Sequence, residues 1–426
     1  MGLKKSKHSN SELQNVLPPS QSPNHINIPI AVNTDDCTFM FIGNHTFLIP
    51  TVKLNDVMRK MEYRDDWIPI QFMIGGKDAS QNVMAFGHSD SLVIIVTADF
   101  KIYCAGKSSE LNSVFMNTTW RDFKIIHNTL DDFVDEIYCI KESALFVTKT
   151  ERSVFAFSNS KFAKLGLGDE MTTVDPVKLK VAHQITKGLV EEMEFPKIKS
   201  ISFSENITAF LTEEGKVLVC GNGKELRLPI KDESEQPYRR LDTPTLIKSL
   251  LKNKVITQVA CGDHHMLFLT NNGELYVCGE GTKGQLGNGK QENVEGAVKR
   301  VKFGLNVKFI AAQRDFSVIV TENDQVWRFG DLEWQVKSKP FIYPLPQLLT
   351  EYNDLGNPPV KKIMAIHSAT IIQTVSDQIY IVGPLDYKLG YEGFRRIEIP
   401  KPSLNTNVKL HLAINSMVCE FLEEEQ

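Results

Sequence analysis

Residues 255–279 read Val255-Ile-Thr-Gln-Val-Ala-Cys-Gly-Asp-His-His-Met-Leu-Phe-Leu-Thr270, followed by Asn271-Asn-Gly-Glu-Leu-Tyr-Val-Cys-Gly279. Two short apolar segments on either side of a Gly-containing corner predict two antiparallel strands. A hairpin turn with Gly273 at a position that tolerates positive φ leads to a third strand ending at Gly279. A Gly-rich loop and a short edge strand are expected to follow. The stretch therefore predicts one antiparallel sheet of four strands.

The same pattern recurs along the chain at a nearly fixed spacing. A Thr and a Gly stand nine residues apart in Thr34–Gly43, Thr97–Gly106, Thr212–Gly221, Thr270–Gly279, Thr321–Gly330 and Thr374–Gly383, and a looser copy runs from Lys149 to Ser158. Gly215, Asp324 and Asp377 occupy the turn position of Gly273, as the left-handed preference of Gly and Asp predicts. Successive copies begin about 50 to 65 residues apart, which is typical of a propeller blade.

The repeats predict an all-β fold, a seven-bladed β-propeller of four-stranded blades. Residues 408–422 look like the first two strands of a blade and residues 37–49 like later strands, so the N-terminal strands are expected to complete the C-terminal blade and close the ring. The propeller domain is expected to span 34–426, with blades at about 34–49 plus 408–422, 82–120, 133–180, 197–247, 255–301, 307–346 and 360–400.

Two segments are longer than a blade needs. Residues 50–80 include Val52–Met61 at helical spacing, and residues 222–253 include the charged run Lys231–Glu235. Long insertions on a propeller either bind a partner or are tolerated surface loops, and the sequence leaves both open.

The pattern resembles the regulator of chromosome condensation family over nearly all of residues 34–422. The family's Asn-x-x-Gly-Gln-Leu-Gly loop is kept as Thr282-Lys-Gly-Gln-Leu-Gly287 and approximated at Asn159–Asp169 and Asp386–Gly390. The resemblance implies a propeller that binds proteins. In the family's exchange factor for the small GTPase Ran, Asp and His residues on one face contact the GTPase and displace its nucleotide without forming a bond.

The loop between the first two strands of each blade is the candidate binding site. Carboxylates in these loops would make one rim acidic and suited to a basic partner surface, and they are Asp90, Glu142, Glu205, Asp263 and Asp315. Asp263 and His265 match the Gly-Asp-x-His form of the family. His265 is expected to be structural, hydrogen-bonded to backbone within its blade, whereas Asp263 and His264 are candidate contacts.

Composition limits the classes of function. The chain has 426 residues, a net charge of −4 and a pI of about 6.2, which does not favour nucleic acid as a partner. Five of the seven cysteines recur at apolar core positions, as a reducing, cytoplasmic environment permits. No spacing typical of a metal site, cofactor loop or catalytic nucleophile occurs, so no enzyme activity, metal or cofactor is expected.

Residues 1–33 are rich in Ser, Asn, Pro and Lys and predict a disordered tail. Its start, Met1-Gly-Leu-Lys-Lys-Ser-Lys-His8, fits the motif for N-myristoylation of Gly2. Lys4, Lys5 and Lys7 would add the electrostatic attraction to anionic lipid that a single acyl chain needs. A plain solvated tail and a short nuclear-localisation patch are the alternatives.

The sequence as a whole favours a non-catalytic protein-interaction scaffold, tethered to a membrane surface through its acylated tail. The alternative is a guanine-nucleotide exchange factor for a small GTPase, which would need a projecting wedge beside the acidic face. A ubiquitin ligase would need a catalytic domain for which residues 34–426 leave no room, and association with chromatin is disfavoured by the net charge.

Overall fold

The structure is a computed structural model that describes residues 39–43, 64–69, 72–74, 77–89, 92–106, 124–127, 132–159, 164–168, 172–186, 189–222, 240–247, 251–332, 342–366, 369–383, 394–397, 399, 407–413 and 416–422. All of them belong to one compact unit, Thr34–Gln426. The predictions for residues 1–33, for Val52–Met61 and for Asp90 lie outside the described residues.

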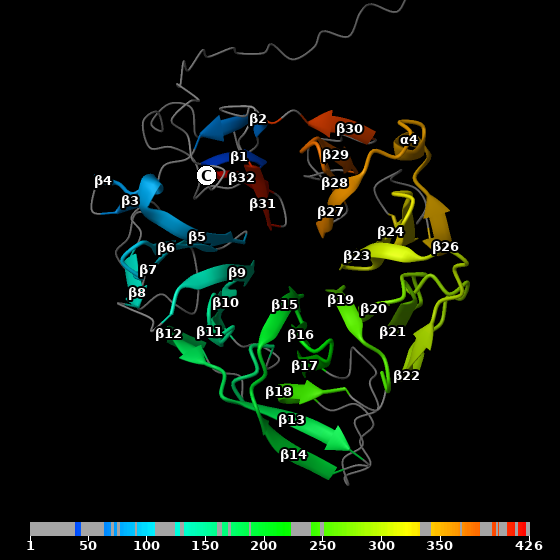
Figure 1. Cartoon of the computed structure of the whole chain (residues 1–426), viewed down its shortest axis with the longest axis horizontal. Coiled ribbons are helices and arrows are strands. Elements are labelled where there is room, and N and C mark those ends of the chain that lie inside the picture. The colour runs from blue at the N-terminus through cyan, green and yellow to red at the C-terminus, as the bar shows by residue number, and fades with distance from the viewer. Residues whose placement is uncertain are drawn as a thin grey trace, which may run out of the picture. The chain divides into compact units, whose positions relative to one another are not determined.

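The fold is an all-β propeller of antiparallel sheets, most of them formed by strands consecutive in sequence (Figure 1). Five four-stranded sheets follow the chain order. They are β5–β8 (Val83–His88, Leu92–Thr97, Ile102–Gly106, Lys124–His127), β9–β12 (Val134–Ile140, Ser143–Thr148, Val154–Asn159, Thr172–Lys178), β19–β22 (Ile256–Cys261, His265–Thr270, Leu275–Gly279, Val294–Arg300), β23–β26 (Val307–Gln313, Phe316–Thr321, Val326–Asp331, Ile342–Leu348) and β27–β30 (Val360–Ile366, Ala369–Thr374, Ile379–Val382, Phe394–Ile397). The strand β8 begins after residue 120, where the sequence pattern had ended its blade.

A sixth four-stranded sheet joins the two ends of the described chain. Its order is β2 (Arg64–Pro69), β1 (Phe39–Gly43), β32 (Ser416–Leu422) and β31 (Asn407–Ala413). The strands β1 and β32 are antiparallel, with Phe39 opposite Glu420 and Gly43 opposite Ser416. The outer strand β2 lies within 50–80, which the sequence pattern had assigned to an insertion.

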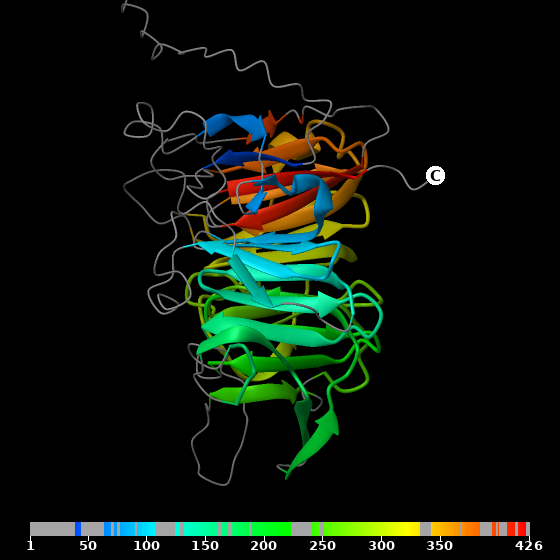
Figure 2. The ribbon, with the colours of Figure 1, turned by 90° about the vertical axis from the view of Figure 1, so that its left-hand side faces the viewer.

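One sheet has six strands. Its inner part is β15 (Ile198–Phe203), β16 (Ile207–Thr212), β17 (Val217–Gly221) and β18 (Leu241–Leu246), and a hairpin of β13 (Val181–Thr186) and β14 (Leu189–Glu194) extends it outward (Figures 1 and 2). The strand β13 runs parallel to β18. The prediction of seven four-stranded blades is therefore wrong in its strand count, because residues 181–194 form a hairpin that pairs with the edge strand of the next sheet. The strand β18 also shortens the insertion predicted over 222–253.

The smaller elements are a hairpin of β3 (Met73–Ile74) and β4 (Lys77–Asp78), the 3-10 turn η3 (Ser80–Asn82) and the short helix α4 (Thr350–Asn353). None of the helices in the described ranges is long and apolar enough to span a bilayer.

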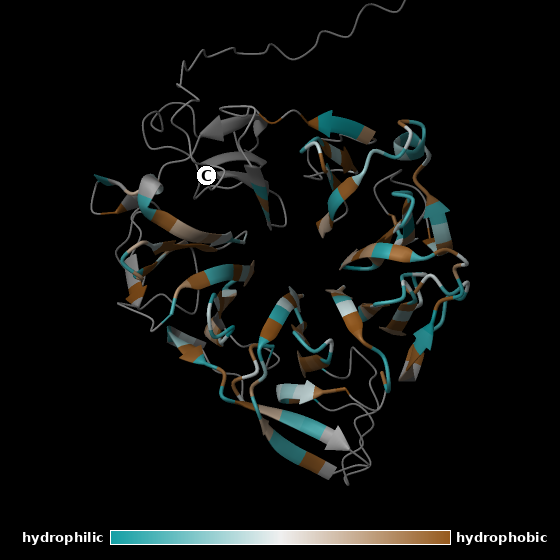
Figure 3. Ribbon diagram, in the orientation of Figure 1, coloured by the Kyte–Doolittle hydropathy of each residue, from teal (hydrophilic) through white to brown (hydrophobic). Residues whose placement is uncertain are grey.

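In six of the sheets the core is built on the second strand. Every residue is buried in β6, β10, β16, β20, β24 and β28. Both faces of these strands therefore pack against other side chains, which explains their continuous apolar sequence. Hydrophobic residues recur in the sheets, whereas the middle of the β13–β14 hairpin is hydrophilic (Figure 3).

The recurring Thr organises the turn between the second and third strands. The N–H of Thr270 donates to the carbonyl of Glu274 at 3.1 Å, and its Oγ1 accepts from the N–H of Glu274 at 3.0 Å. Thr212, Thr321 and Thr374 make the same pair of bonds. The predicted left-handed residues are confirmed, with φ of 75° at Gly215, 77° at Gly273, 57° at Asp324 and 56° at Asp377.

The recurring Gly at the end of the third strand lies against the loop between the first two strands. Gly279 has a φ of 103°, and a Cβ there would lie 2.4 Å from the carbonyl oxygen of His264. That oxygen accepts a hydrogen bond from the N–H of Glu280 at 2.8 Å. Gly221 and Gly330 stand in the same relation to Asn206 and Asp315. The absence of a side chain therefore lets the third strand reach the loop and fix it.

Gly279→Ala is expected to lower the free energy of unfolding by about 3 kcal/mol or more, because it combines a left-handed φ with a backbone clash. Gly304→Ala is the control, since Gly304 has a φ of 84° but no atom within 4 Å of an added Cβ. It should cost only about 1 kcal/mol. Thermal unfolding of both variants measures the difference, and equal losses would contradict this role of the closing Gly.

Candidate protein-binding face

In four sheets the turn between the first two strands encloses two residues, and these turns share one backbone pattern. The N–H of Gly262 donates to the carbonyl of His265 at 2.9 Å and encloses Asp263 and His264, and the N–H of Ser204 donates to Ile207 in the same way. In two other sheets Ile140 pairs with Ser143 and Gln313 with Phe316. The described loops are Lys141–Glu142, Glu205–Asn206, Asp263–His264 and Arg314–Asp315.

The first strands of the sheets surround a central channel. Its volume is about 520 Å³, and it is lined by residues of β5, β9, β15, β19, β23, β27 and β31 (Figure 1). His88, Lys141 and Gln313, at the ends of first strands or in the loops that follow them, are among the lining residues. The two-residue loops therefore lie around one mouth of the channel, and we call this surface the loop face.

Neighbouring loops are linked by hydrogen bonds. The N–H of Asp263 donates to the carbonyl of Arg314 at 3.1 Å, and Nδ2 of Asn206 donates to the carbonyl of Asp263 at 3.4 Å. The hydroxyl of Ser89 donates to the carbonyl of Lys141. These bonds join loops of successive sheets, so the loop face presents its side chains from a fixed backbone.

The loop face carries charges of both signs. Glu205 is ion-paired with Lys141 of the preceding loop. Asp315 binds Nζ of Lys283 at 2.9 Å, and the same amine lies 3.4 Å from the carboxylate of Asp331. The hydrogen bond to Asp315 raises the pKa of Lys283. The carboxylates at 205 and 315 are thus partly neutralised within the chain.

Asp263 differs from the other carboxylates of the loop face. It is half-buried, and none of the described residues donates a hydrogen bond to its carboxylate. Burial raises its pKa, and the nearby charges of Glu205 and Asp315 raise it further, while His264 and Arg314 act in the opposite direction. A half-buried carboxylate without a donor can gain strongly from a cationic partner group.

His265 joins two sheets. Its ring is fully buried, and its Nε2 lies 2.8 Å from Oγ of Ser317 in the next sheet. Ser317 donates to the carbonyl of Gln285 at 2.8 Å, so its oxygen accepts from His265, which places the proton on Nε2. Burial lowers the pKa of His265 to about 4, which keeps the ring neutral at pH 7.

The structural role predicted for His265 therefore fits its position, but its partner is a side chain of the next sheet and not backbone within its own. The ring also packs against Gly262, where an added Cβ would lie 2.4 Å from Nδ1. This contact gives a physical reason for Gly three residues before the His.

The structure brings together five of the six predicted contact residues on the loop face: Glu142, Glu205, Asp263, His264 and Asp315. Sequence reasoning missed the cations among them, Lys141, Lys283 and Arg314. Lys141 and Arg314 begin their loops with φ of 48° and 46°. Aligning the loops by their first residue would have revealed Lys141 and Arg314 but not Lys283, which lies in the Gly-rich loop after β21.

Five cysteines are free thiols, and burial raises their pKa, to about 12 for Cys261. In the part of the chain that the structure describes, no group of three or more His, Cys, Asp or Glu side chains could hold a metal ion.

Comparison with known families identifies the repeats. The model of the regulator of chromosome condensation (RCC1) repeat matches residues 214–269 and 272–312, and a second model of this repeat matches 256–285. These ranges contain the Gly-Asp-His-His corner and the Gly-Gln-Leu-Gly loop. The chain is a β-propeller that contains regulator of chromosome condensation repeats within residues 214–312.

The chain spans only a small part of the curated relatives that it matches. The chain is 27% identical to the human E3 ubiquitin-protein ligase HERC2 over 286 residues, which is 65% of this chain and 6% of the ligase. It is 33% identical to the Protein RCC2 homolog of Xenopus laevis over 125 residues, 29% of this chain and 23% of the relative. The X-linked retinitis pigmentosa GTPase regulator homolog of Caenorhabditis elegans is 25% identical over 46% of this chain and 13% of its own length.

Two solved structures have the same fold. Human WBSCR16 is similar with a TM-score of 0.64 at 16% identity, over 91% of this chain and 99% of that one. Prp20p of Saccharomyces cerevisiae, described with its binding properties to Gsp1p and histones, has a TM-score of 0.63 at 16% identity, over 91% and 92% of the two chains.

Asp263→Asn is expected to raise the midpoint of thermal unfolding at pH 7. Because the pKa of Asp263 is higher in the folded chain than the unfolded value of 3.8, ionisation favours unfolding, and this loss of stability grows as pH rises from 3.8 through the folded pKa. Measured from pH 4 to 8, the gain over wild type should widen with pH.

Asp315→Asn is the matched control for this series. The Asp315 carboxylate is ion-paired with Lys283, so its loss should lower the midpoint at pH 7. If Asp263→Asn also lowers the midpoint, the carboxylate stabilises the fold and its interpretation as a contact residue is wrong.

Proposed function

We propose that this chain is a non-catalytic protein-interaction scaffold that binds a basic surface of a partner through its loop face. The observation that carries the proposal is the half-buried Asp263 carboxylate, which has no donor among the described residues and sits on a loop held by hydrogen bonds on both sides. Unpaired carboxylates of this kind reduce stability, and binding sites commonly contain such groups.

The neighbouring side chains define the partner chemistry. The charges of His264, Arg314 and the ion-paired Glu205 and Asp315 act on Asp263, and a partner Arg or Lys could bind Asp263 directly. Glu142 lies on the loop of Lys141, farther along the loop face. Binding to the paired carboxylates would require exchange with Lys141 or Lys283, so we expect those pairs to set specificity more than affinity.

We also propose that the propeller has seven blades and a closed ring. The six-stranded sheet would count as one blade, with β13 and β14 as an addition to its outer edge, and the sheet of β2, β1, β32 and β31 would be the blade that closes the ring. The lining of the channel by strands from β5 to β31 supports this count.

The second candidate function is regulation of a small GTPase as its guanine-nucleotide exchange factor. Prp20p is described as binding Gsp1p, and the relative in Caenorhabditis elegans is named a GTPase regulator homolog. The loop face of this chain keeps the Gly262-Asp-His-His265 corner that the resemblance connects with GTPase contact. The histones in the description of Prp20p make a basic protein partner a further possibility for the same face.

Affinity purification from native cells should separate the two functions. We expect partners that are retained equally in EDTA and in Mg-GTP, and that Asp263→Lys releases while the midpoint of thermal unfolding stays within a few degrees. Glu213→Lys, an exposed charge reversal on the turn after β16, is the control and should retain them. A small GTPase enriched only in EDTA would instead favour the exchange factor. If Asp263→Lys does not fold, Asp263 has a structural role and is not a contact residue.

We further propose that the tail is N-myristoylated at Gly2 and, together with Lys4, Lys5 and Lys7, holds the protein at an anionic membrane surface facing the cytoplasm; a nuclear location is the alternative. The motif and the adjacent lysines support this. Intact mass of the natively expressed protein should show one C14 acyl group, absent from Gly2→Ala. A wild-type mass without the acyl group would remove the membrane proposal and leave the loop face unaffected.

A further inference from the structure

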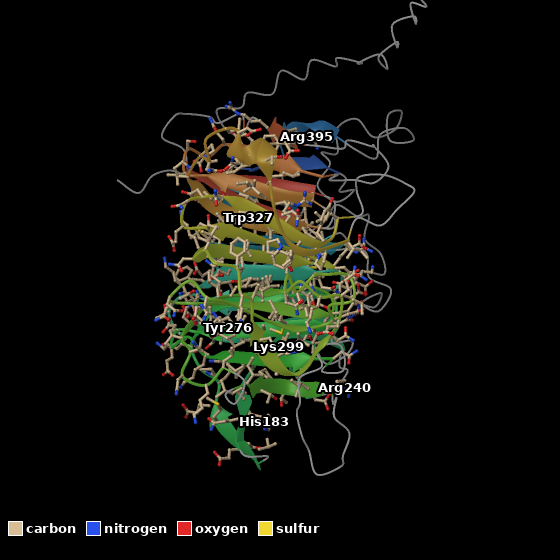
Figure 4. All side chains as sticks on the ribbon, turned by 90° about the vertical axis from the view of Figure 1, so that its right-hand side faces the viewer. His183, Arg240, Tyr276, Lys299, Trp327 and Arg395 are labelled. Atoms are coloured by element: carbon tan, nitrogen blue, oxygen red, sulfur yellow. The ribbon has the colours of Figure 1, made fainter. Side chains whose placement is uncertain are left out.

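The β13–β14 hairpin leaves a sheet edge uncovered within the described residues. The strand β14 is the outermost strand of the six-stranded sheet, and its only strand partner is β13. Alternate N–H and C=O groups of such a strand point away from the sheet, where another extended segment can pair with them. The hairpin projects beyond β18, with His183 labelled on it in Figure 4.

The β13–β14 hairpin is added to the outer edge of a sheet that already has four strands, β15–β18, like six other sheets. The strand β13 pairs with β18 through His183 opposite Thr245 and Gln184 opposite Leu246. Ala182 is fully buried and Met193 packs against the core, which fixes the hairpin in place. A firmly held hairpin with an open edge is suited to receive a partner strand.

The strand β14 carries both acidic and apolar side chains. Val190 is 60% exposed, and Glu191, Glu192 and Glu194 are exposed as well. Val190, Glu192 and Glu194 share one face of the strand, and Glu191 shares the other face with Met193. No cation forms an ion pair with these carboxylates among the described residues.

We propose that the open edge of β14 binds an extended basic segment of a partner protein as an added strand. An antiparallel partner segment would place a basic residue opposite each Glu of β14 and an apolar residue opposite Met193 and Val190. Its order, read from Glu194 to Val190, is basic, apolar, basic, basic, apolar. The main-chain hydrogen bonds supply affinity, and the order of charges fixes the register. The inference rests on the proposed function as a protein-binding module, but it uses a surface other than the loop face.

The test uses a fluorescein-labelled peptide, Thr-Lys-Val-Lys-Lys-Val-Thr, and the full chain in a fluorescence anisotropy titration. We expect saturable binding that Glu192→Lys/Glu194→Lys weakens about tenfold or more, since two attractive cross-strand pairs become repulsive. Glu213→Lys/Glu214→Lys, the same charge change on an exposed turn of this sheet, is the matched control and should bind as wild type. Unchanged thermal unfolding of both variants shows that they fold.

Backbone pairing is tested separately from charge. Peptides with N-methyl groups on alternate residues, made in both alternations, keep every lysine but lose the donors on one edge. We expect one of the two to lose binding. If both bind like the parent peptide, attraction is electrostatic only and the proposed strand addition is wrong.

Two further outcomes would overturn this inference and leave the proposed function of the loop face valid. Loss of peptide binding in Asp263→Lys but not in Glu192→Lys/Glu194→Lys would assign the peptide to the loop face. A concentration-dependent dimer in analytical ultracentrifugation, abolished by Glu192→Lys/Glu194→Lys, would show that a second copy of the chain occupies the edge. Wild-type peptide binding in Asp263→Lys, with loss of the cellular partner, would separate the two surfaces.

Discussion

Burial of the second strand on both faces is the constraint on which the sheets depend. A strand with six buried residues, such as β20 or β24, cannot lie at the surface of a single sheet. It requires a neighbouring sheet on each side, and the side-by-side sheets of a propeller provide one. Contacts between sheets then follow from the same packing, including the hydrogen bond of His265 to Ser317 and the N–H of Val307 donating to Gly273 at 3.0 Å.

The repeat pattern can be understood as the set of backbone positions that hold such a sheet together. Thr closes the turn after the second strand with two hydrogen bonds, and Gly at the end of the third strand admits the carbonyl of the loop between the first and second. The residues that are not constrained in this way are those in the loop itself. Side chains at these loop positions differ between copies, so the loop face can acquire a binding function without loss of the fold.

The loop face shows how tertiary structure alters charges that look alike in the sequence. Glu205, Asp263 and Asp315 lie in corresponding loops. Glu205 and Asp315 form ion pairs with Lys141 and Lys283, whereas Asp263 forms none among the described residues. Lys283 reaches Asp315 from the Gly-rich loop of the preceding sheet, 32 residues away in sequence. A carboxylate that contributes least to folding is the one best placed to contribute to binding, which is the usual relation between stability and function.

Sequence alone determined the first three strands of the repeats, the turns between them and the positions of Gly and Asp with positive φ, because hydrophobic period, turn chemistry and backbone sterics act within a few residues. It also located the loops and named most of their acidic residues. It did not reveal the β13–β14 hairpin, because the parallel pairing of β13 with β18 joins residues about 60 positions apart and leaves no local signal. The pairing of β1 with β2, the Ser317 partner of His265 and the cations beside Glu205 and Asp315 were likewise decided by the tertiary structure, since each depends on which sheets become neighbours and not on the sequence around the residue itself.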